Sequence, residues 1–133
     1  MNVIYDLDFA ARTACSLSEK NEMLAVVDFF AKLSEDARRE GLLKLQNMLS
    51  DASMNFLPAK GFRMILEGVK RETIREVLER HILFNDLKGV ELLNACIQME
   101  GVLCIASGEH PRLVRQRLHG MLGESFLTEE KLL

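Results

Sequence analysis

The sequence has no tryptophan, one tyrosine, two prolines and three cysteines among its 133 residues. So little proline, with only eight glycines, excludes collagen-like and low-complexity chains. A secreted disulfide framework needs more cysteines and an even number of them. We therefore expect Cys15, Cys96 and Cys104 to be reduced thiols in apolar surroundings. The hydrophobic content of 48% is typical of one globular domain, which we assign to residues 1–133.

Neither sign of charge dominates. Lys and Arg number 17 against 20 Asp and Glu, a net charge of −3, and aromatic residues make up only 6%. This composition disfavours nucleic acid and anionic membranes as partners. Residues 1–6 lack the basic and apolar pattern of a signal peptide. The most apolar window, 89–107, contains Glu91 and Glu100, and each acid costs about 3 kcal/mol at a bilayer centre. We expect a cytoplasmic location without membrane insertion.

Helix-forming residues are abundant throughout and no alternating pattern of a strand competes. The sequence therefore predicts an all-α fold, a compact bundle of about five or six helices. Ser16 and Glu19 have capping-box spacing, which predicts a helix from Leu17. Ser34 offers a second N-cap, so residues 17–49 form either two helices or one. Gly41 is expected to lie inside the second part, on its inward face.

Proline and glycine mark the later boundaries. Pro58 suits the first turn of a helix that ends at Gly68, and Pro111 suits the first turn of the last helix, which runs to about residue 122. A further amphipathic helix is expected over 73–84, with Arg75 and Glu79 facing outward. A linker over 85–89 precedes a long apolar helix, 90–106, that Gly108 ends. Residues 123–133 form a tail.

No arrangement of an enzyme or metal site is evident. The chain lacks a phosphate-binding glycine loop, a nucleophile elbow, a zinc-binding His-Glu-x-x-His and paired Cys-x-x-Cys, so we expect no catalysis, cofactor or metal. Glu100, next to Gly101 in the apolar helix, must be paired or neutralised if buried. It could serve as a general base. We interpret it as a structural ion pair with a neighbouring helix, for which Arg112 is the candidate partner.

Four blocks of the chain resemble, in order, the MotA-type flagellar stator subunit of the MotA/TolQ/ExbB proton-channel superfamily. Residues 37–46 (ARREGLLKLQ) resemble its cytoplasmic signature, and 56–68 (FLPAKGFRMILEG) a segment that ends in a "DG" or "EG" turn. Residues 73–79 (TIREVLE) resemble the helix after it. Residues 99–112 (MEGVLCIASGEHPR) resemble the family's "EGVLAIQAGENPR" stretch.

The family's four membrane helices have no counterpart in this sequence. Two of them should precede the first block and two should lie between the third and fourth, where only residues 81–90 are available. The resemblance therefore implies a chain that corresponds to the cytoplasmic portions of a stator subunit, does not conduct ions, and is located in the cytoplasm near the motor at the inner face of the membrane.

The resemblance also implies a partner. Charged groups of the family's cytoplasmic domain interact with the rotor switch protein, FliG, and the family's arginine is matched by Arg38. The family's acid falls on the neutral Gln46, so Arg39, Glu40 and Lys44 are the candidates for substitute contacts. These residues could equally solvate a helix face.

Three functions remain open at this level. The first is docking on rotor or membrane-bound stator components. The second is a generic helical adaptor or homodimer, and the third is a small helical ligand-binding protein or enzyme that uses Glu100 with a nearby thiol or histidine.

Overall fold

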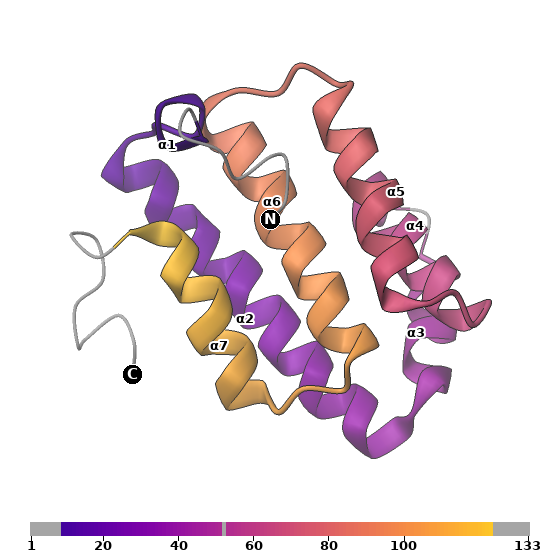
Figure 1. Cartoon of the computed structure of the whole chain (residues 1–133). Helices are drawn as coiled ribbons and strands as arrows, with labels where there is room; N and C mark the ends of the chain where they lie inside the picture. The colour runs from indigo at the N-terminus through magenta and orange to yellow at the C-terminus, as the bar shows by residue number, and fades with distance from the viewer. Residues whose placement is uncertain (1–8, 52, 124–133) are drawn as a thin grey trace.

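The computed structural model describes residues 9–51 and 53–123. Within these residues the regular elements are helical and no strand is present, which confirms the predicted all-α bundle. A single helical turn precedes six longer helices that pack together (Figure 1). The predicted tail lies outside the described residues apart from Gly123. The elements are α1 (Phe9–Arg12), α2 (Leu17–Glu40), α3 (Leu42–Met48), α4 (Phe56–Leu66), α5 (Arg71–Leu83), α6 (Gly89–Ala106), α7 (Pro111–His119) and a 3₁₀ turn, Gly120–Leu122.

The start of α2 is the predicted capping box. The Glu19 amide donates to Ser16 Oγ and the Ser16 amide donates to Glu19 Oε1, both at 3.0 Å. The second cap predicted at Ser34 is wrong, because Ser34 is buried in the middle of α2. Its hydroxyl instead donates to the carbonyl of Glu109, in the turn before α7. A side chain that the sequence offers as a local cap is used here for tertiary contact.

The break in the 17–49 segment falls at Gly41. Its φ of +72° is the left-handed region that favours glycine, and this ends α2. The prediction that Gly41 faces inward is therefore wrong: Gly41 is exposed, and Leu42 beside it is 55% exposed. The change of direction leaves Leu45 as the buried residue of α3. The turn thus presents apolar surface to solvent.

Helix α6 is the centre of the bundle, in contact with α2, α4, α5 and α7. Of the helices in the described part of the chain, it is the one long and apolar enough to cross a membrane, and 67% of it is buried inside the fold. Apolar residues all round its surface suit a helix with neighbours on every side. The predicted limits of this helix are confirmed within one residue.

Two glycines let helices approach α6 closely. A Cβ built on Gly101 would lie 2.5 Å from the ring of Phe30 in α2, and one on Gly61 would lie 2.5 Å from a methyl of Val102. Phe30 and Val102 are fully buried, so neither can move away. Helix surfaces can pack this closely only where a glycine, which has no side chain, leaves the space.

The boundaries predicted from proline and glycine agree with the structure, whereas α5 begins two residues before the predicted 73 and α7 ends at His119, before the predicted 122. Pro58 lies in the first turn of α4, and Pro111 is the first residue of α7. Gly68 and Gly108 follow α4 and α6 with φ of +77° and +66°. His110 caps α7, since its Nδ1 accepts from the Arg112 amide at 3.1 Å.

Different segments of the chain meet at the two ends of the bundle. The turn before α2 meets the α5–α6 linker at one end, where a hollow of about 390 Å³ is lined by Ala14, Leu83 and Lys88 among others. The end of α2 and the turn between α6 and α7 lie at the opposite end (Figure 1). Gly41 and Gly108 line a hollow of about 320 Å³ there. Helix α2, with 24 residues, spans about 36 Å between the two ends.

Substitution of Gly101 tests the close packing of α2 on α6. Gly101→Ala should lower the free energy of unfolding by about 1–3 kcal/mol, because the added methyl overlaps the Phe30 ring. The measurement is urea denaturation. Gly120→Ala is the matched control, since nothing lies within 4 Å of its Cβ position and its φ is −56°. Equal stability of the two variants would contradict the packing.

The buried His119 of α7 makes stability depend on pH. Burial and then the Arg115 charge lower the pKa of His119 below 6.5, against a smaller opposing effect of Asp28. The unfolded chain therefore takes up a proton first as pH falls through about 6.5, and stability should decline from that pH to the lower pKa of the folded state. His119→Gln should flatten this part of the profile, measured by urea denaturation at each pH. An unchanged slope would contradict the assignment.

Candidate docking surface at the α2–α3 corner

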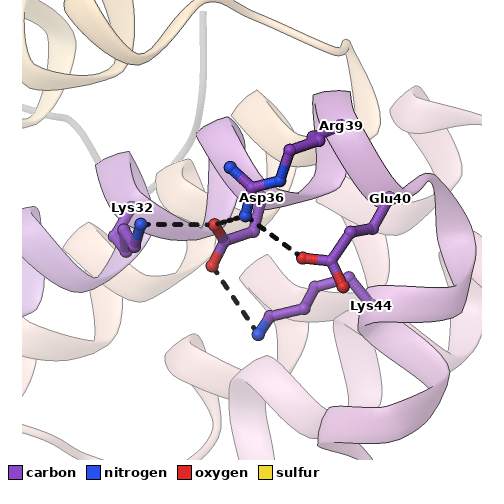
Figure 2. A network of polar contacts seen from close by, with 5 residues as sticks. All are labelled: Lys32, Asp36, Arg39, Glu40 and Lys44. Atoms are coloured by element: carbon purple, nitrogen blue, oxygen red, sulfur yellow. Dashed lines mark hydrogen bonds and ion pairs between the residues drawn. The ribbon is translucent and has the colours of Figure 1, made fainter.

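Charged side chains gather where α2 turns into α3. Asp36 is at the centre of this group: its Oδ1 lies 3.4 Å from Lys32 Nζ and 2.9 Å from an Arg39 nitrogen, and its Oδ2 lies 3.6 Å from Lys44 Nζ. Arg39 also reaches Glu40 at 3.4 Å (Figure 2). We call these five residues the charged corner. The structure thus brings together Arg39, Glu40 and Lys44, three of the predicted partner-binding residues.

Asp36 fixes the geometry of the charged corner. Its side chain is only 10% exposed, whereas those of Lys32 and Arg39 are 64% and 61% exposed. Partial desolvation on its own raises the pKa of Asp36, but the charges of Lys32, Lys44 and Arg39 outweigh it and the pKa lies below 3.8. The carboxylate is therefore ionised at neutral pH. It orders three cations whose outer faces remain in solvent.

Arg38 has a different role from its neighbour Arg39. Its Nη1 donates to the carbonyl of Gly108 at 3.0 Å and so joins the end of α2 to the end of α6. The side chain remains exposed, beside the hollow of about 320 Å³. Apolar residues, including Leu42 and Ile105, form most of this hollow's lining.

The corner combines charge with exposed apolar surface. Leu42 and Leu43 are 55% and 57% exposed, and Lys44 follows them directly. Gln46 is exposed on the same helix, α3. Exposed ion pairs add little to stability but guide association with an oppositely charged surface, and apolar side chains supply contact area. This arrangement suits a protein surface that offers carboxylates around an apolar residue.

Lys32, Asp36, Leu42 and Leu43 are not among the predicted site residues. The i to i+4 spacing of Lys32 and Asp36 was an available signal, because such residues are neighbours on a helix. The exposure of Leu42 and Leu43 could not be read in this way, since their pattern is that of a buried face and only the turn at Gly41 reverses it.

Glu100 belongs to an ion pair with α5 and not with Arg112. Its two carboxylate oxygens accept from Nη1 and Nη2 of Arg75, both at 2.9 Å, and Arg75 also contacts Glu79 at 3.4 Å. Arg112 is exposed on α7. Arg75 and Glu79 were expected to face outward, but Glu79 is buried and Arg75 is 19% exposed. The reason is that α5 packs along α6, which turns this face inward.

The thiols nearest Glu100 are poor nucleophiles. Burial, with a smaller effect of the Glu100 charge, raises the pKa of Cys96 to about 12. Burial and a hydrogen bond to Glu109 raise the pKa of Cys104 to about 12. The reactive form of a cysteine is its thiolate, which neither residue provides near neutral pH. Over residues 9–51 and 53–123, no three His, Cys, Asp or Glu side chains gather as a metal site would require.

Comparison with protein-family models, with curated proteins and with solved structures gives no match to this chain. The resemblance to stator subunits therefore stays a prediction from the four sequence blocks.

Thiol labelling tests the environment of the cysteines. Cys15 is half-buried, whereas Cys96 and Cys104 are buried. A disulfide reagent at mildly alkaline pH should therefore label at most one thiol of the native protein, slowly because burial raises the pKa of Cys15 as well, and all three in denaturant. Cys15→Ser should abolish the native labelling. Rapid labelling of more than one thiol would contradict the burial of α6.

Proposed function

We propose that this chain is a cytoplasmic, MotA-like protein of the flagellar motor, which docks on the rotor switch protein FliG through the charged corner. It has no part in ion conduction. Membrane-bound stator subunits are a further partner implied by the same resemblance. One observation carries the proposal. The connections that correspond to the family's membrane side lie at one end of the bundle, and the charged corner lies at the other.

One end corresponds to the membrane side of the family. In a stator subunit, two membrane helices would lead into the first block, and two would lie between the third and fourth. In this chain the end of α5 and the start of α6 join the third and fourth blocks, and α2, whose last residues open the first block, begins beside them. The end of α5 and the starts of α6 and α2 lie at one end of the bundle (Figure 1). A Cβ built on Gly89 there would lie 3.5 Å from the carbonyl oxygen of Ala14. A single attachment side supports descent from a membrane-anchored subunit.

The other end carries the charged corner, about 36 Å away along α2. In a membrane-anchored relative this end would point into the cytoplasm, toward a rotor. Arg38 and Arg39 are exposed there, and Lys44 has 31% of its side chain exposed. This chain has the neutral Gln46 where the family has an acid. Glu40, in the same group of residues, supplies a carboxylate, and its side chain is 39% exposed. The surface therefore keeps both signs of charge.

Self-association is a second candidate function. The end with the α5–α6 linker exposes three large apolar side chains: Leu17 is 67%, Leu83 is 40% and Phe84 is 86% exposed. Burial of such side chains favours association in water. A homodimer formed through this end would leave the charged corner free.

Charge reversal at the corner tests the docking function. The variant Arg39→Glu should weaken binding to purified rotor switch protein by about tenfold and reduce its salt dependence, since the guiding cation becomes an acid. Arg38→Glu tests the residue that matches the family. Arg80→Glu is the matched control, because Arg80 is exposed near the far end of α5. Binding is measured by biolayer interferometry at low and high salt.

Binding that is equal in all three variants would remove the charged corner from the interface. No binding by the unmodified chain would reject the rotor switch protein as partner. Concentration-dependent mass in sedimentation, lost in Phe84→Ser, would then favour the homodimer.

A further inference from the structure

A hollow of about 390 Å³ opens between α2, the loop before α4, and α6. Its walls are mainly apolar and include the rings of Phe29 and Phe30 and the side chains of Met48 and Met54. Its volume lies in the range of pockets that hold small molecules. Methionine side chains adapt to ligands of varied shape. We call it the Gln98 pocket, after the polar residue that α6 contributes to it.

Gln98 is the residue of α6 that lines the pocket. The residue is 9% exposed, and its side chain makes no hydrogen bond to any residue in the ranges that the structure describes. Its amide atoms are not among the side-chain atoms shielded from solvent, so a molecule in the pocket can reach them. Ser53 and Asn55, in the loop before α4, add exposed polar groups to the lining. A donor and an acceptor that no described residue uses are therefore accessible at the surface of an apolar hollow.

The charge of the lining restricts the ligand. Asp51 is the charged residue of the pocket, and its Oδ1 accepts from the amide and the hydroxyl of Ser53 at 2.9 and 2.7 Å. These hydrogen bonds lower the pKa of Asp51 below 3.8, so it is an anion at neutral pH. Among the described residues, no lysine or arginine lines the pocket. Phosphates and carboxylates are therefore disfavoured, while neutral molecules are not.

We propose that the Gln98 pocket binds a small, uncharged, planar molecule that carries a lactam edge. A lactam presents an N–H and a C=O side by side, and a glutamine amide offers the complementary C=O and N–H. Both polar atoms of Gln98 would thus be paired at once. The flat apolar part of the ligand would lie against the phenylalanine and methionine side chains. This proposal does not depend on the docking function, which uses the charged corner.

The test uses 2-quinolone as the probe, a flat bicyclic lactam, and measures its affinity by calorimetry. Quinoline has the same rings without the lactam, and 2-naphthoate is a flat anion of similar size. The unmodified chain should bind 2-quinolone about tenfold more tightly than quinoline, and 2-naphthoate more weakly still, because two hydrogen bonds distinguish the lactam. This comparison needs no variant.

Gln98→Met retains length and removes the amide. This variant should bind 2-quinolone about tenfold more weakly and bind quinoline with unchanged affinity. Gln116→Met, at an exposed position on α7, is the matched control and should bind both as the unmodified chain does. Circular dichroism checks that each variant is folded. If Gln98→Met fails to fold, the comparison of the three probes still decides.

Three results would overturn the proposal: no binding of 2-quinolone, equal affinity for 2-quinolone and quinoline, or equal 2-quinolone affinity in Gln98→Met and the unmodified chain. Tighter binding of 2-naphthoate would also overturn it, since that result would assign the pocket to anions.

Discussion

The burial of α6 on every side is the constraint on which the rest of the fold depends. A helix surrounded by α2, α4, α5 and α7 needs neighbours that fit its surface, and Gly61 and Gly101 provide the space for two of them. Buried polar groups on such a helix are normally paired, although Asn94 Oδ1 has no partner in the described chain. Glu100 has one in the two-pronged contact with Arg75. The side chain of Gln98 has none in the described chain, and its amide is open to the pocket, which makes it a candidate ligand contact.

Two regions of the surface follow from how the helices end. Gly41 turns the chain so that Leu42 and Leu43 face solvent beside the ions that Asp36 gathers. The loop after α3 then leaves the Gln98 pocket open between helices. The first region suits a large partner with acids on its surface, and the second suits a small neutral molecule. Both regions include residues of α2, but no residue of the charged corner lines the pocket.

Most of the fold could be predicted because local signals set it. The capping box at Ser16, the prolines Pro58 and Pro111 and the glycine Gly108 mark helix ends through backbone geometry alone, and the structure agrees. Predictions failed where tertiary contact decides. Ser34 looks like a cap but bonds to Glu109, and Glu100 pairs with Arg75 because α5 lies on α6. The centre of the charged corner was missed for the same reason, since Asp36 gains its third cation, Lys44, across the turn.

Ser34 and Arg38, one turn apart on α2, both donate to carbonyls of the segment between α6 and α7, those of Glu109 and Gly108. Together they fasten the start of α7, where Pro111 already restricts the backbone. Helix α7 is therefore fixed at its first residue, in addition to the burial of Val114 and Leu118 along its length. Local opening at the start of this helix must break both hydrogen bonds as well as that packing.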